Sequence, residues 1–258
     1  MQRQGIFRTL GWVAIAFSAA FATAVQAAAN VQSMHGDVRV GNQQLRVGDR
    51  ITSGATITTG RSALAVLRFD DSQVVVLNEN TTFKITDFRY RQDEPPNDRP
   101  IFDLVRGALR VISGAVASRN QQSFQLRIPQ ATIGIRGTDF MVAIVNPAYT
   151  SVGTGAISLT NSGGTTVLGP GSFGSVSSAS SLAVSIPASA VPAAASAAFS
   201  NMSALAGVVA GGMAPGAAGV GAGAGIVNIV PAALAIGAAV AVGATVQNKD
   251  NPTVTHNP

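Results

Sequence analysis

The sequence predicts an all-β domain, followed by a Ser/Ala/Pro linker and a Gly/Ala-rich hydrophobic segment. Between residues 30 and 172 the chain consists of short β-branched and apolar runs separated by glycine, with no sustained helical period. Phe124–Ile128 alternates apolar and polar residues, as a half-buried strand does. Phe140–Val145 is apolar on both faces. Strands buried on both faces predict two packed sheets or a closed coil rather than one exposed sheet.

A loose internal repeat refines this expectation. Gly36–Val40, Gly107–Val111 and Gly155–Leu159 each begin with glycine and continue with two apolar residues spaced by two. Such a module predicts a tight turn that delivers the chain into a short strand. The repeat is compatible with a β-helix-like solenoid or a sandwich of short strands, and its irregular spacing leaves both open. Between the strands, Asp87–Pro100 combines prolines and charges, which predicts an exposed loop.

The N-terminus has the features of a secretory signal peptide. A short basic stretch precedes the apolar run Leu10–Phe21, and small residues follow at Ala27–Ala29. We therefore expect residues 1–27 to be removed, together with Trp12, the only tryptophan. An uncleaved anchor is the alternative, but the apolar run is shorter than the roughly 20 residues of a spanning helix. The sequence thus predicts an exported protein of the periplasm or cell envelope.

The C-terminal third contains almost no charge, since none of Asp, Glu, Lys or Arg occurs between Asp139 and Lys249. Residues 173–203 are rich in Ser, Ala and Pro, which predicts a flexible linker. Residues 204–246 are dominated by Gly and Ala, with small residues four apart, a spacing that permits close helix packing in a membrane. We expect a helix for membrane or self-association there, with low-complexity disorder as the alternative, and a polar tail over 247–258.

Composition excludes several functional classes. The chain has no cysteine, and its two histidines, His35 and His256, lie far apart, so no metal site, cofactor site or catalytic group is predicted. The formal charge is +5, but without Arg3 and Arg8 of the leader 15 basic residues face 12 acidic ones. These charges are interleaved rather than clustered, which argues against nucleic-acid binding.

Four clusters of residues, in order along the chain, resemble the FecR domain family. They are Leu45–Ile51, Gly54–Ala63, Phe69–Ser72 and Pro129–Phe140. The resemblance implies an all-β periplasmic module that binds proteins and performs no chemistry, as in bacterial regulators of the ferric-citrate type. Their order and spacing make the four clusters together more specific than any one of them.

The resemblance also shows where this chain departs from the family. In the regulators, a cytoplasmic anti-sigma segment and a transmembrane helix precede the module. Here only the leader precedes it, so we expect a standalone exported form, and a link to iron-uptake-type signalling rests on the resemblance alone. Asp71 and Ile128 stand where the family usually has glycine and threonine.

The family motif residues are expected to be structural. In Arg136–Asp139 we expect Gly137 to adopt a conformation that other residues avoid, and the polar side chains to satisfy local hydrogen bonds. A recognition loop or ion site is the alternative. Asp70–Ser72 predicts a β-turn, because the downstream acidic ligand of a calcium loop is missing. The motif set comprises Gly48, Asp49, Gly60, Asp70, Ser72, Pro129, Arg136, Gly137, Thr138, Asp139 and Phe140.

One loop is a candidate contact site. Arg89, Tyr90 and Arg91 are of types enriched at interface hot spots, and they lie in the proline-bounded loop. A solvated charged loop is the alternative interpretation. The leading hypothesis is a non-enzymatic protein-interaction or sensing module whose partner is an unidentified envelope protein. The alternative is a structural or surface-assembly protein that uses its Gly/Ala-rich segment for membrane insertion or self-association.

Overall fold

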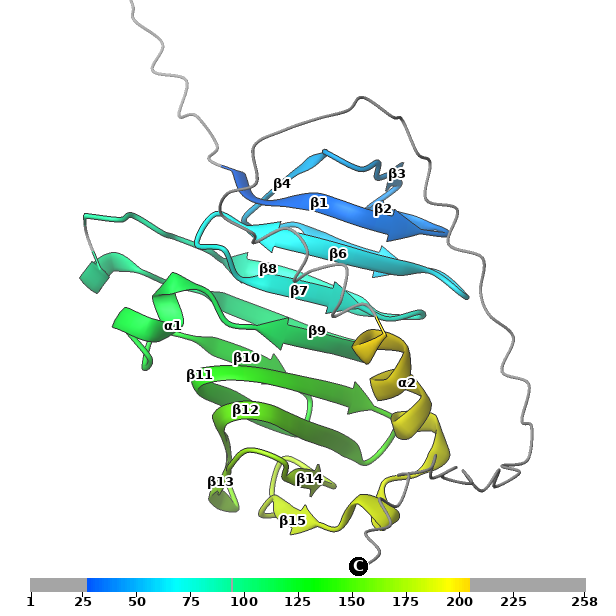
Figure 1. Ribbon diagram of the computed structural model, residues 1–258, viewed down its shortest axis with the longest axis vertical. Helices are drawn as coiled ribbons and strands as arrows, with labels where there is room; N and C mark the ends of the chain where they lie inside the picture. Colours follow the sequence, from blue (N-terminus) through cyan, green and yellow to red (C-terminus); the bar gives the residue numbers. More distant parts are fainter. Residues whose placement is uncertain (1–26, 94, 205–258) are drawn as a thin grey trace, which may run out of the picture. The chain divides into compact units, whose positions relative to one another are not determined.

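The computed structural model describes residues 27–93 and 95–204, which form one β-rich unit with two short α-helices (Figure 1). The strands are β1 (Ala27–His35), β2 (Val38–Val40), β3 (Gln43–Gln44), β4 (Arg50–Thr52), β5 (Thr56–Thr59), β6 (Leu64–Phe69), β7 (Val74–Leu77), β8 (Thr82–Asp87), β9 (Ile101–Ile112), β10 (Gln125–Ile128), β11 (Ala131–Ile144), β12 (Ala148–Asn161), β13 (Gly164–Leu168), β14 (Phe173–Val176) and β15 (Val184–Ile186). The helices are η1 (Pro95–Asn97), α1 (Ala115–Arg119), η2 (Ala188–Ala190) and α2 (Ala193–Ser203).

The strand pairing divides this continuous sheet into two layers, because the long strands pair with different neighbours along their two halves. Residues 101–106 of β9 lie beside β8, whereas residues 107–112 lie between β7 and β11. Strands β11 and β12 are divided in the same way. Layer one consists of β4, β1, β6, β7, the C-terminal halves of β9 and β11, the N-terminal half of β12, β14 and β15. Layer two consists of β3, β2, β5, β8, the N-terminal halves of β9 and β11, β10, the C-terminal half of β12, and β13.

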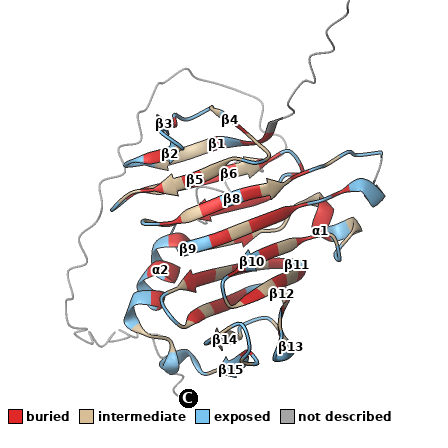
Figure 2. Cartoon of the chain, turned by 180° about the vertical axis from the view of Figure 1, so that it is seen from behind, coloured by how far each residue is buried: buried red, intermediate tan, exposed pale blue. Residues whose placement is uncertain are grey.

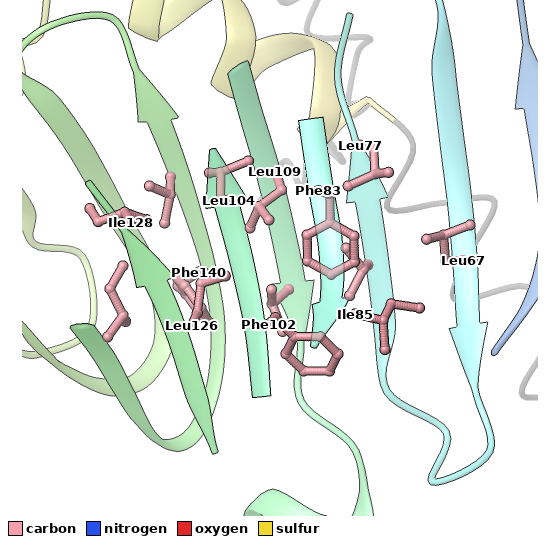
Figure 3. Packing of buried hydrophobic residues seen from close by; sticks show 14 of the residues in the cluster. Leu67, Leu77, Phe83, Ile85, Phe102, Leu104, Leu109, Leu126, Ile128 and Phe140 are labelled. Carbon is pink, nitrogen blue, oxygen red and sulfur yellow. The ribbon is translucent and has the colours of Figure 1, made fainter. Parts of the chain in front are cut away.

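The core lies between the two layers (Figure 3). Phe69 of layer one contacts Phe102 of layer two with ring centroids 5.2 Å apart, and Phe124 contacts Phe140 at 6.5 Å. Residues along β10 alternate between this core and solvent, as the sequence pattern predicts. The outer face of layer two stays open, so buried and exposed residues also alternate along β8 (Figure 2). The all-β fold class is confirmed.

A sandwich describes the architecture better than a solenoid. Every strand pair in the described residues is antiparallel except β9 with β10, whereas a β-helix requires parallel neighbours throughout. The crossover that makes this one parallel pair contains α1.

The repeated glycines mark places where the chain passes from one layer to the other. Gly36 joins β1 to β2, while Gly107 and Gly155 lie within the continuous strands β9 and β12. All three have positive φ, at 73°, 87° and 70°. Two of the predicted turns are therefore bends inside long strands. Glycine is needed there because a Cβ on Gly107 would lie 2.5 Å from the Cα of Thr81.

Residues 173–203 do not form the predicted flexible linker. They contain β14, β15 and α2, and α2 packs on the outer face of layer one. Four of its residues, spaced for one helix face, are buried there: Ala195, Ala198, Phe199 and Met202. Composition misled the prediction because small Ser and Ala side chains are compatible with a helix that packs closely on a sheet.

Several expectations concern residues that the structure does not describe. The leader before Ala27, most of the 204–246 segment and the 247–258 tail lie outside the described residues. None of the helices in the described part is long and apolar enough to cross a membrane.

Candidate functional site

A polar cleft of about 550 Å³ opens on the outer face of layer two. Its floor is formed by neighbouring residues of β11 and β12, where register pairs Thr132 with Thr160 and Gly134 with Ser158. The lining residues are Gln121, Gln122, Phe124, Gln125, Thr132, Gly134, Ile135, Arg136, Ala156, Ile157, Ser158, Thr160 and Val167. Side chains of successive strand residues point to opposite faces, so the core residue Ile133 separates the outward-facing Thr132 and Gly134.

Small residues on the floor leave the space that forms the cleft. A Cβ on Gly134 would lie 2.8 Å from the Oγ of Ser158, so a side chain there would displace the Ser158 hydroxyl and fill the cleft floor. Ala156 lies opposite Arg136 in the next cross-strand pair and adds only a methyl group. The cleft therefore results from the small side chains at Gly134, Ala156 and Ser158 rather than from a gap in the sheet.

Arg136 supplies the only charge among the residues that line the cleft. Its side chain is exposed, and within the described chain it makes no ion pair and no side-chain hydrogen bond. Gly137 follows it with φ 57° and ends the layer-two half of β11. The predicted local hydrogen bonding of Arg136 is therefore absent from the described structure. A free guanidinium beside amide and hydroxyl groups can bind an acidic or strongly polar partner group.

The rest of the Arg136–Asp139 motif faces elsewhere. Thr138 is buried, and its carbonyl accepts a hydrogen bond from the backbone N–H of Ser113 at 2.9 Å. Asp139 pairs with Arg110, whose Nε and Nη2 lie 2.8 and 2.5 Å from the two carboxylate oxygens. Phe140 is fully buried in the core. Among these residues, Arg136 faces outward, whereas Thr138, Asp139 and Phe140 hold the fold.

The remaining motif residues stabilise turns at separate places in the domain. The N–H of Gly48, at φ 91°, donates to Val31 O at 2.8 Å, and Asp49 accepts the N–H of Arg46 at 2.8 Å. Gly60 binds Asp37 O through its N–H at 2.8 Å. The turn positions Asp70, Ser72 and Pro129 are exposed. The structure does not bring these residues together at one site.

The Arg89–Arg91 loop is anchored by a residue pair that the sequence analysis missed. Arg119 binds the fully buried carboxylate of Asp98, with Nε and Nη2 at 2.8 and 3.0 Å from its oxygens. The same guanidinium lies 4.6 Å from the ring centroid of Tyr90 and donates to the carbonyl of Arg91 at 2.5 Å. Arg89 is 66% exposed and pairs with Asp87. The loop is therefore held in place, with Arg89 as its outward-facing residue.

Asp71, the departure from the family turn, is buried and serves as an anchor. Its Oδ1 accepts the N–H of Gln73 at 2.9 Å, and its carbonyl accepts the N–H of Ala115 at 2.8 Å. Burial raises the pKa of the Asp71 carboxyl, although backbone N–H donors at Gln73 and Val116 lower it. No short-range signal in the sequence distinguishes this buried aspartate from its exposed neighbour Asp70.

This raised pKa predicts a pH effect on stability. A carboxyl whose folded pKa exceeds its unfolded pKa stabilises the fold fully below the unfolded value, and that contribution is lost as pH rises through the folded value. We expect wild type to lose stability relative to Asp71→Asn as pH rises from acidic to neutral, because the variant cannot ionise. Urea unfolding of both proteins over this range measures the difference. A difference independent of pH would contradict the assignment.

The described residues contain no group of three His, Cys, Asp or Glu side chains that could hold a metal ion. A rigid two-layer scaffold that presents a polar cleft with one unpaired arginine is typical of a binding domain.

Comparison with known proteins identifies the domain. Residues 55–158 match the model of the family described as FecR protein, and this range holds the clusters Phe69–Ser72 and Pro129–Phe140 and all but the first residue of Gly54–Ala63. The family supports a signalling or sensing module that works through contact with other proteins. A search of curated proteins found no match.

Two solved structures are similar in fold to part of the chain. Both are crystal structures of a "putative anti-sigma factor" from Parabacteroides distasonis ATCC 8503. They are 16% and 19% identical to this chain, with TM-scores of 0.41 and 0.42. Each alignment covers 51% of this chain and 58% of the solved one, so this chain spans little more than half of that protein's length.

Proposed function

We propose that this chain is an exported, non-enzymatic protein of the bacterial envelope whose FecR domain recognises another envelope protein through the layer-two cleft. The observation that carries the proposal is the placement of Arg136. It belongs to the Arg136–Asp139 motif and lies at a cleft, and unlike Asp139 its side chain has no partner in the described chain. Its exposed guanidinium can therefore form charge-assisted hydrogen bonds with a group of another molecule.

The cleft chemistry indicates the kind of surface recognised. Its lining contains no carboxylate, one guanidinium, three glutamine amides and several hydroxyl groups. Such a set favours a protein segment with an acidic side chain opposite Arg136 and backbone groups opposite the amides. An Arg in a polar cleft is a typical hot spot, whereas exposed ion pairs such as Arg89–Asp87 contribute little.

Export is the second part of the proposal, and the start of β1 limits where the leader can be cleaved. Ala28 and Ala29 are buried, and Ala29 pairs with Ile51 and Phe69 of neighbouring strands. Cleavage after Ala27 would leave these residues in the mature strand, whereas cleavage after Ala29 would remove two buried core residues. We therefore place the cleavage site after Ala27, which fits the small-residue pattern of a signal peptidase.

Photo-crosslinking tests the binding proposal. A photoreactive amino acid at Ser158 on the cleft floor should cross-link a discrete envelope protein in living cells, and Arg136→Ala should weaken that complex by about 2 kcal/mol, or roughly thirty-fold in affinity. The matched control is Arg127→Ala, because Arg127 is exposed on the adjacent strand β10 but does not line the cleft.

Both variants should keep wild-type stability, since each removes an exposed side chain. Equal loss of the complex in both would show general charge attraction and refute the cleft assignment. Cross-linking only from a position outside the cleft, such as Thr58 on β5, would refute it as well. If the captured protein is an outer-membrane receptor, the link to iron-uptake-type signalling gains its first support.

A further inference from the structure

Both layers of the sheet end side by side in an edge strand. In the described residues β13 pairs only with β12, and β15 pairs only with β14. The two edges are joined, because Thr166 Oγ1 of β13 donates to Ala183 O, just before β15, at 2.5 Å. This end of the sheet therefore presents backbone groups of two strands along one border.

The same end exposes apolar side chains. Val167 is 65% exposed, Leu182 50% and Val184 52%, so three of the six large exposed hydrophobic residues in the described chain lie here. Leu182 lies close to β13, since a Cβ on Gly164 would lie 3.1 Å from its Cδ1. Charged side chains are one of the features by which natural edge strands avoid pairing with another chain. Neither β13 nor β15 carries a charged residue.

The opposite end of the sheet provides the contrast. Its edge strands β3 and β4 also have an exposed apolar neighbour, Val47, at 62%. That residue is flanked by Arg46, Asp49 and Arg50, which is the charge pattern of a protected edge. The end formed by β13 and β15 has no charged residue, because none occurs between Asp139 and Lys249.

We infer that the β15 edge pairs with β15 of a second copy of this chain, across a two-fold axis. An uncharged edge with apolar flanks can pair with an identical edge. The net positive charge of each copy lies on other parts of the chain, so it does not oppose contact at this edge. Antiparallel pairing of all three residues places Ser185 opposite the partner's Ser185, and Val184 opposite the partner's Ile186. This inference is independent of the cleft and of the partner proposed for it.

The interface is small, so the dimer forms reversibly. A three-residue strand pair with its apolar flanks buries less than the roughly 1,200 Å² of a stable interface. The dimer fraction should therefore depend on protein concentration. A single charged residue introduced at the edge should lower that fraction.

The lack of cysteine in the chain makes a direct test available. Ser185 is exposed, so Ser185→Cys in the exported full chain should form a disulfide-linked dimer under mild oxidation. Directly opposed residues of an antiparallel pair have Cα atoms about 4.5–5.5 Å apart, within disulfide range. Val47→Cys, at the charged edge, is the matched control and should stay mostly monomeric.

A second variant measures the equilibrium without covalent capture. Val184→Lys should raise the dimer dissociation constant at least about tenfold in sedimentation equilibrium, whereas Val47→Lys should leave it unchanged. A wild-type chain that stays monomeric at all concentrations overturns the inference. So does a dimer that Val184→Lys does not weaken, since that dimer would use another surface. Equal disulfide yields from Ser185→Cys and Val47→Cys would also overturn it. None of these results bears on the photo-crosslinking test of Arg136→Ala.

Discussion

Gly155→Ala is expected to cost more than about 4 kcal/mol of stability, a large share of the roughly 5–15 kcal/mol that holds a domain folded. The φ of Gly155 is 70°, which costs an L-residue roughly 1–2 kcal/mol by itself. A Cβ would also lie 2.1 Å from the carbonyl oxygen of Gly137 and 2.6 Å from that of Arg136. Both atoms belong to the backbone of the neighbouring strand, so relief requires the β11–β12 pairing to open.

Gly137→Ala is the matched control for this prediction. Gly137 has φ 57°, but a Cβ there meets nothing within 4 Å. Its substitution should cost only the backbone penalty of roughly 1–2 kcal/mol. Urea unfolding followed by far-ultraviolet circular dichroism compares the two variants with wild type. Similar costs for both would mean that the layers do not cross at Gly155 as described.

Removal of either partner of the Arg110–Asp139 pair is expected to destabilise the fold by about 2 kcal/mol, below the 3–5 kcal/mol typical of fully buried pairs. The two side chains are 11% and 25% exposed, and their bidentate geometry joins β9 to β11. Arg110 also donates to Met202 O at 3.3 Å, so it connects these strands to the C-terminal end of α2. Hydrogen bonding to Asp139 raises the pKa of Arg110, which stays charged when the pair is intact.

A double-mutant cycle isolates the interaction. Arg110→Met and Asp139→Asn should each lower the free energy of unfolding. The double variant should lose less stability than the sum of the two single losses, because the second change removes a group that already lacks its partner. Denaturant unfolding of the four proteins gives the coupling energy. Additive effects would show that the pair contributes nothing beyond the two separate side chains.

The half-buried Arg119 provides a contrast to this pair. Its partner Asp98 has a fully buried side chain, and Arg119 also binds carbonyls of the loop at Arg91 and Gln92. The two buried or half-buried arginine pairs therefore have different roles. One joins strands and a helix within the sheet, while the other fixes the conformation of a loop.

Local sequence patterns were enough to predict the strands and the FecR domain. Alternation in Phe124–Ile128 and two-sided apolarity in Phe140–Val145 depend on neighbours in the chain, and so do the positive-φ glycines of the repeat. The four clusters that identify the FecR domain are likewise local. Even α2 left a local signal, since Ala195, Ala198, Phe199 and Met202 are spaced as one helix face, although the Ser/Ala/Pro composition concealed it.

The partners of the polar residues, in contrast, depend on tertiary contacts. Asp139 is separated from Arg110 by 29 residues and Asp98 from Arg119 by 21, and strand register and packing bring each pair together. Arg136 lies three residues from Asp139, yet the bend at Gly137 places their side chains on different parts of the domain. Adjacent positions in a sequence share composition but not surroundings. The cleft and the uncharged β15 edge therefore depend on how the two layers assemble.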